Sequence, residues 1–210
     1  MFDLPKTTLV KKVIPKNAFD SYTSAKQKKL FTERLLRITW INKLSTDTIN
    51  LQGKDVVEIQ IFEIELKEKS DVRTILEVID KSIPYTIIFV VRFENFFYLS
   101  TSVKHLNPHN IDNAVIDYTF TSNWFLNEEN TFTINLKNNL DWSYKNFCEQ
   151  FKQALNKTEK IEELVNYHKE KDSTEKEITK LKTAISNCKQ FNKKVILNLK
   201  LKDLLNKLRA

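Results

Sequence analysis

Glycine is nearly absent from this 210-residue sequence, in which Gly53 is the only one. Loops that cradle phosphate groups need several residues without a Cβ, because the backbone must approach the anion closely. The sequence contains no G-x-G-x-x-G, G-x-x-x-x-G-K-[ST] or G-x-S-x-G pattern. These absences argue against P-loop motors, dinucleotide-dependent enzymes and serine hydrolases of the nucleophile-elbow type, and we expect no bound cofactor.

Cysteines and long apolar runs are also scarce. Cys148 and Cys188 lie in segments with helical spacing, and we expect them to be buried, reduced thiols of a cytoplasmic protein. The longest apolar run, within residues 84–91, is too short to span a bilayer. The N-terminal residues lack the apolar region and the cleavage site of a signal peptide. We therefore expect neither membrane association nor secretion.

The net charge of +7 is unevenly distributed along the chain. Residues 181–210 carry eight basic residues against one acidic residue, and residues 1–35 carry eight against three. The remaining residues, 36–180, carry 18 against 23. A basic segment attracts nucleic-acid phosphates without reading the base sequence. The alternative interpretation of the C-terminal segment is a solvated helix surface that is rich in lysine.

The spacing of apolar residues predicts an α+β fold with a central mixed or antiparallel sheet packed with helices. Helical spacing covers residues 23–44 and 72–83, with Ser70 as the N-cap of the second helix. Alternating or apolar runs predict strands at 56–67, 84–91, 96–103, 114–125 and 131–136. The apolar phase changes at Ile61–Phe62, which predicts either a β-bulge or a strand with halves covered on opposite faces. We expect this core domain to span residues 1–140.

Residues 141–210 are expected to form a helical region with a basic tail. Thr174 and Glu177 match a T-x-x-E capping box, which would start the last helix. An apolar seam with heptad-like spacing follows, and its members are Ile178, Leu181, Ile185, Cys188, Val195 and Leu199. The seam predicts either an intramolecular antiparallel hairpin with residues 158–172 or a coiled-coil surface for a partner helix or a second copy.

One group of residues would suit a metal-dependent nuclease of the PD-(D/E)xK type. Such enzymes place an acid and an E-x-K on adjoining strands, where they hold a divalent metal and activate water. Glu65 and Lys67 form an E-x-K within one predicted strand. Asp55 or Asp47 would supply the upstream acid, and Glu33 would supply a carboxylate from a helix. The competing interpretation is an exposed, ion-paired strand face, since E-x-K arises by chance in a chain rich in Lys and Glu.

Five blocks that span nearly the whole chain carry a resemblance to a known family: LPKTT (4–8), RITWINKLSTDTINL (37–51), VVEIQIFEIELK (56–67), IDKSIPYTIIFVVRFENFFYLSTS (79–102) and KQFNKKVILNLKLKDL (189–204). On these blocks the sequence resembles the uncharacterised bacterial family called domain of unknown function 4391. None of them is a catalytic motif, so the resemblance carries over no active-site residue. It implies a genomic context, because members are often encoded beside helicase and DNA methyltransferase genes of restriction-type or phage-defence clusters.

We therefore expect a non-catalytic accessory module of a bacterial DNA-processing or phage-defence system. The residues expected to bind DNA or RNA are Lys189, Lys193, Lys194, Lys200, Lys202, Lys207 and Arg209. The residues expected to dock a helicase or DNA methyltransferase partner are Ile178, Leu181, Ile185, Val195 and Leu199. Two alternatives stay open, namely the metal-dependent nuclease and a structural homodimer with no nucleic-acid role.

Overall fold

The computed structural model describes residues 2–108, 110–151 and 158–209, and the chain divides into two compact units. The first unit spans Met1–Leu155 and the second spans Asn156–Ala210. The α+β class and the helical C-terminal part are as expected. Helix α4 (Leu140–Glu149) belongs to the first unit and packs against its sheet.

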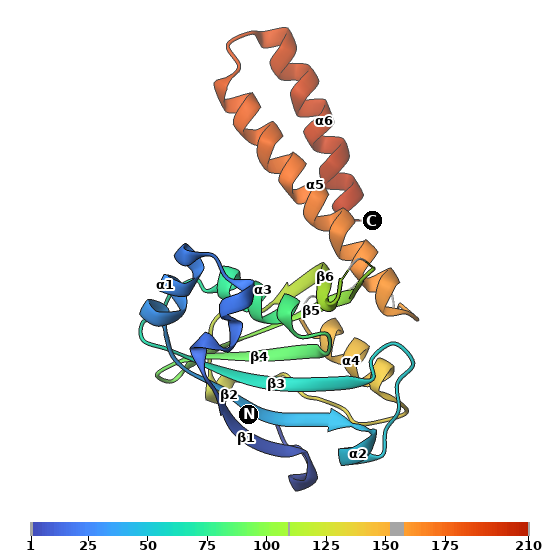
Figure 1. Ribbon diagram of the computed structural model, residues 1–210. Helices are drawn as coiled ribbons and strands as arrows, with labels where there is room; N and C mark the ends of the chain where they lie inside the picture. Colours follow the sequence, from blue (N-terminus) through green and yellow to red (C-terminus); the bar gives the residue numbers. More distant parts are fainter. Residues whose placement is uncertain (1, 109, 152–157, 210) are drawn as a thin grey trace. The chain divides into compact units, whose positions relative to one another are not determined.

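The first unit is built on one mixed sheet with the strand order β1-β2-β3-β4-β5-β6, and a short β7 pairs with β5 (Figure 1). β3 and β4 run parallel, whereas the other described pairs are antiparallel. Helix α3 makes the crossover connection that a parallel pair requires. The strands are β1 (Leu9–Ile14), β2 (Leu35–Ser45), β3 (Glu58–Leu66), β4 (Thr86–Phe93), β5 (Phe96–Asn107), β6 (Asn110–Thr121) and β7 (Phe125–Leu126).

Helices cover both faces of this sheet. α1 and α3 lie on one face (Figure 1), where Phe31, Ile79 and Phe89 belong to one buried cluster. α4 covers the opposite face, where the hydroxyl of its Tyr144 lies 3.0 Å from that of Thr101 on β5. Thr101 stands between Ser100 and Ser102 in the strand, and these two serines face α3. Because side chains alternate along a strand, Thr101 and α4 lie on the other side of the sheet. The helical elements are η1 (Lys6–Thr8), η2 (Lys16–Tyr22), α1 (Ala25–Arg34), α2 (Thr46–Ile49), α3 (Arg73–Ser82), η3 (Asn127–Glu129) and α4.

Strand β3 explains the phase change that the sequence shows at Ile61–Phe62. Its register against β4 is regular, and Ile61 and Phe62 are both buried, on opposite faces. The first half of β3 is therefore covered on both faces. Its second half is buried on the α3 face, while Glu63 and Glu65 are half-buried on the other face. A bulge is present, but in the neighbouring strand β2, at Ile41.

The predicted helix at 23–44 is wrong in its second half. α1 ends at Arg34, and the residues from Leu35 onward form β2. The helix begins as expected for its sequence, with Ser24 and Gln27 forming a capping box. The segment LLRITWINKLS is rich in β-branched and aromatic residues, and it pairs with strands on both edges. These pairings outweigh its helical spacing.

Two smaller predictions in this unit are also wrong. Ser70 is not the cap of α3, because the N-cap position is Val72, and the carboxylate of Asp71 accepts the N–H of Arg73. Residues 131–136 form no strand. The side-chain amide of Gln150 bonds the N–H and the carbonyl of Thr133 there, each at 2.8 Å, and so replaces a neighbouring strand.

The second unit is an antiparallel helical hairpin of α5 (Ile161–Asn187) and α6 (Phe191–Arg209), which lie side by side (Figure 1). The helix start predicted at Thr174 is wrong, because α5 runs through it and the Thr174 hydroxyl donates to the carbonyl of Glu170. The hairpin therefore pairs α5 with α6, and not residues 158–172 with the helix after them. Among the described residues, no helix is both long and apolar enough to cross a bilayer.

Both cysteines are free thiols. Cys148 is fully buried in α4, and this burial raises the pKa of its thiol. Cys188 is only half-buried, because it lies at the end of α5. The expectation of two buried thiols is therefore correct for Cys148 alone.

The single glycine allows a close contact between the loop before β3 and α4. The carboxylate of Asp141 accepts the backbone N–H groups of Lys54, Asp55 and Val56 at 2.6, 3.0 and 2.7 Å. A Cβ on Gly53 would lie 2.1 Å from the carbonyl oxygen of Val56, far inside contact distance. These hydrogen bonds hold the loop before β3 against α4. The loop requires glycine at position 53, because a side chain there would collide with the Val56 carbonyl.

We expect Gly53→Ala to lower the free energy of unfolding of the first unit by about 1–3 kcal/mol, the usual cost of overpacking. Urea denaturation followed by tryptophan fluorescence measures this change, because Trp40, Trp124 and Trp142 all lie in this unit. Gln52→Ala is the matched control, since Gln52 is exposed and contributes its backbone carbonyl to α4. Equal stability of the two variants would contradict the proximity argument.

Candidate functional site

The basic residues predicted to bind nucleic acid lie on α6 and on the connection that precedes it. Their described side chains are all exposed, and they are Lys189, Lys193, Lys194, Lys200, Lys202 and Lys207. Arg209 is the last residue of α6, and its side chain lies outside the described ones. One helix and its entry therefore carry the whole predicted set.

The positive charge of α6 is opposed by one acidic residue of that helix, Asp203. Between Glu177 and Asp203 the sequence contains seven lysines and no acidic residue. In the part of the chain that the structure describes, neither Lys189 nor any lysine of α6 forms an ion pair. α5 differs, because acidic and basic residues are interspersed along it up to Glu177. The field around α6 is therefore positive, and such a field attracts polyanions.

The predicted apolar seam is divided between the two helices of the hairpin. On α5, Ile178 is buried while Leu181 and Ile185 are half-buried. On α6, Val195 and Leu199 are 43% and 59% exposed. The half-buried side chains of α6 are different ones, and their burial indicates that they pack against α5; they are Leu197, Leu201, Leu204, Leu205 and Leu208. The seam is thus not one continuous surface.

Phe191, Val195 and Leu199 form an outer stripe on α6, at successive spacings of four residues. Phe191 is 79% exposed, the highest value among the large apolar side chains that the structure describes as exposed. Phe191 is not among the residues predicted from the sequence. Its spacing of four from Val195 was the pattern that could have indicated it.

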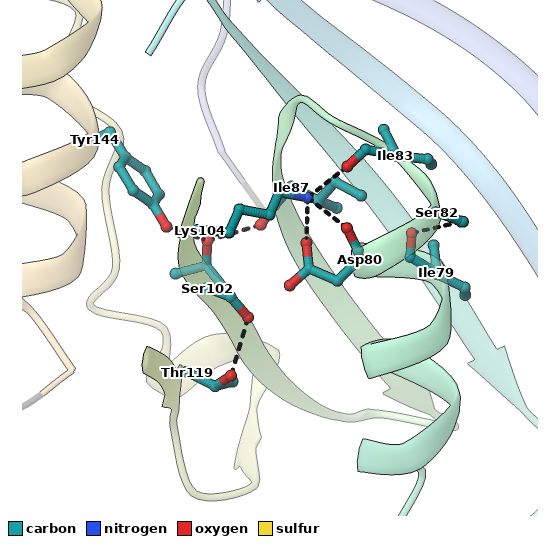
Figure 2. Close-up of polar contacts among 10 residues, drawn as sticks. Ile79, Asp80, Ser82, Ile83, Ile87, Ser102, Lys104, Thr119 and Tyr144 are labelled. Atoms are coloured by element: carbon teal, nitrogen blue, oxygen red, sulfur yellow. Dashed lines mark hydrogen bonds and ion pairs between the residues drawn. The ribbon is translucent and has the colours of Figure 1, made fainter. Parts of the chain in front are cut away.

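A buried ion pair joins α3 to the sheet (Figure 2). The ammonium group of Lys104, on β5, donates to the carboxylate of Asp80 at 2.6 Å. It also donates to the carbonyl oxygens of Asp80 and Ile83, at 2.7 and 2.8 Å. The side chains of Lys104 and Asp80 are 3% and 2% exposed. All three N–H groups of the ammonium are used, and two of them satisfy carbonyls at the C-terminal end of α3.

Burial shifts both partners of this pair toward their neutral forms. It raises the pKa of Asp80 and lowers the pKa of Lys104, while the charge of each partner opposes the shift of the other. Three oxygen acceptors surround the ammonium, and they favour a charged Lys104 beside an ionised Asp80. This pair was not predicted from the sequence, although Lys104 comes directly after a predicted strand that carries Ser100 and Ser102 on one face.

A cleft of about 410 Å³ opens between α3 and the β5–β6 pair, beside this ion pair. The neighbouring hydroxyl of Ser102 lowers the pKa of Asp80, against the effect of burial. The hydroxyl of the exposed Thr119 lies 3.0 Å from that of Ser102 (Figure 2). The members of this cluster are hydrogen-bonded to one another, which favours a structural role for them.

Glu65 of the E-x-K lies between two arginines. Arg37 of β2 donates to one of its carboxylate oxygens at 3.0 Å, and Arg92 of β4 donates to the other at 2.8 Å. These arginines occupy the positions beside Glu65 on the two neighbouring strands. A divalent cation needs free carboxylate oxygens and further oxygen ligands beside them. The arrangement therefore favours the ion-paired strand face over a metal site.

The other residues of the nuclease hypothesis have separate surroundings. Lys67 donates to the carbonyl of Thr32 at 2.8 Å, at the C-terminal end of α1. Glu33 pairs with Lys29 on the exposed side of α1, and Asp55 is exposed in the loop before β3. Among the described residues, no three His, Cys, Asp or Glu side chains are grouped so that they could hold a metal ion.

These features define an α+β protein in which a sheet unit is followed by a helical hairpin with one strongly basic helix. The chain belongs to the family described as a domain of unknown function, DUF4391, whose model matches residues 2–208. Comparisons with curated proteins and with solved structures found no match.

We expect Lys104→Met to lower the free energy of unfolding by about 3–5 kcal/mol, because it leaves the buried carboxylate of Asp80 without its counter-ion. Lys81→Met is the matched control, since its exposed pair with Glu77 contributes less than about 1 kcal/mol. Urea denaturation of both variants measures the difference. Similar losses in the two variants would contradict the importance of the buried pair.

The loss in Lys104→Met should become smaller at acidic pH. A carboxyl group whose pKa is raised in the folded state stabilises that state below its unfolded pKa, and this contribution is lost as the pH rises through the folded pKa. Burial raises the pKa of Asp80 above the ordinary value of 3.8, and removal of Lys104 raises it further. The deficit of the variant should therefore shrink as the pH is lowered from neutrality toward that ordinary value.

Proposed function

We propose that this protein is a non-catalytic accessory module of a DNA-processing or defence system and that it binds nucleic acid through α6. The observation that carries the proposal is the set of exposed lysines on α6, a helix with one acidic residue, Asp203; among the described residues these lysines form no ion pair. Binding to phosphates would release counterions, so the affinity would depend strongly on salt and weakly on base sequence.

The charged groups of the sheet unit support this assignment by contrast. Lys104 is hydrogen-bonded to Asp80 and to two backbone carbonyls, and Arg37 and Arg92 both form ion pairs with Glu65. Charges that are paired within the fold contribute little to the attraction of a distant polyanion. The unpaired lysines of α6 are therefore better placed to contribute to it.

The outer stripe of α6 would dock a protein partner. Val195 and Leu199 are exposed apolar side chains on one face of a helix, a pattern that suits packing against another helix or a groove. The family resemblance adds the class of partner, a helicase or a DNA methyltransferase. A second copy of this chain is the alternative occupant of the stripe, and sedimentation of the purified protein distinguishes a homodimer from a monomer.

We expect replacement of Lys193, Lys200 and Lys207 by Gln to weaken binding to a labelled DNA duplex. Each lost phosphate contact should also reduce the slope of log affinity against log salt by about 0.9, so the total reduction should approach about 3. Fluorescence anisotropy at several salt concentrations measures both quantities on the full chain.

The matched control replaces Lys169, Lys171 and Lys176 of α5 by Gln, which changes the net charge equally. Equal weakening by the two triple variants would contradict a site on α6 and would indicate attraction by net charge alone. Mg²⁺-dependent cleavage of DNA that Glu65→Gln abolishes would favour the nuclease instead.

A further inference from the structure

The tip of the hairpin combines one exposed aromatic side chain with several lysines. Phe191 begins α6 and is 79% exposed. Lys189, Lys193 and Lys194 lie within three residues of it in the sequence, and all three are exposed. Neither cationic nor aromatic character alone would distinguish this tip from an ordinary surface. An aromatic ring among three exposed lysines, however, matches the flat base and the negatively charged phosphate of a nucleotide.

The lysines argue against a protein-docking role for Phe191 itself. The centres of protein interfaces are depleted in charged residues, and lysine in particular is rare there. Three lysines around Phe191 would have to lose hydration or be neutralised if a protein covered this ring. Val195 and Leu199, farther along the outer stripe, each have two lysines within three residues in the sequence, whereas Phe191 has three, and they are aliphatic, so they suit protein packing better than Phe191 does.

A nucleotide fits the same tip without this conflict. Every base has a flat π-face that can stack on an exposed aromatic ring, and ammonium groups a few residues away can contact the flanking phosphates. Bases within a duplex already stack on their neighbours, whereas unpaired bases are free to stack on a side chain. The combination therefore selects for single strands over duplexes.

We propose that the hairpin tip, residues 189–194, binds single-stranded nucleic acid with a base stacked on Phe191 and with phosphates held by Lys189, Lys193 and Lys194. The proposal rests on the proposed function, because it takes nucleic-acid binding by α6 as given. It adds the strandedness of the ligand and a residue that contacts bases.

The test compares Phe191→Ala, Phe191→Trp and Val195→Ala in the full chain. Fluorescence anisotropy is measured with a labelled oligo-thymidine and with a labelled duplex. Loss of one stacked base corresponds to a weakening of about tenfold, so Phe191→Ala should bind the oligo-thymidine about tenfold more weakly than the wild type. Phe191→Trp should retain the affinity, and Val195→Ala, the control on the same stripe, should bind as the wild type does. The duplex affinity should stay unchanged in all three variants.

The outcomes separate this inference from the proposed function. If Phe191→Ala binds the oligo-thymidine as tightly as the wild type in a salt-dependent manner, the stacking proposal is overturned and nucleic-acid binding by α6 stands. Equal weakening by Phe191→Ala and Val195→Ala would also overturn it, because the stripe would then act as a general apolar surface. Failure of the wild type to bind either nucleic acid would contradict the proposed function, and the stacking proposal with it.

Discussion

The ammonium group of Lys104 is the contact on which the position of α3 depends. It holds the C-terminal carbonyls of α3 and the carboxylate of Asp80 against β5. α3 is also the crossover between the parallel strands β3 and β4, and its apolar side chains complete the buried cluster on that face. A charge with three short acceptors in a dry environment fixes one geometry, because every alternative leaves it unpaired.

The two units differ in whether their charged side chains are paired. In the sheet unit, the charges near the core have partners, as the pairs of Asp80 with Lys104 and of Glu65 with two arginines illustrate. Such pairs fix the register of helices and strands. On α6, the lysines face solvent and the helix has only one acidic residue, Asp203, which leaves their field available to a ligand. We therefore propose that the first unit is a scaffold and that the second contacts the ligand.

The fold could be predicted from the sequence where local pattern and tertiary pairing agree. β3, β4, β5 and α3 have long apolar or periodic segments, and the structure has them where expected. The prediction was wrong at residues 35–45, because pairing with two strands outweighs helical spacing, and at residues 131–136, where the Gln150 side chain replaces a strand. The basic set of α6 could be predicted because charge is a property of composition. The partners of Glu65 and the exposure of Phe191 could not, because they depend on which strands adjoin β3 and on where α5 ends.

Hydrogen–deuterium exchange of the full chain, with and without saturating oligo-thymidine, tests the central claim that ligand contact is confined to the hairpin. Amides within residues 182–202 should exchange more slowly in the complex, while those of β3 and β4 around Glu65 should be unchanged. Protection confined to β3 and β4, with none on α6, would contradict the account and would assign the ligand to the ion-paired strand face.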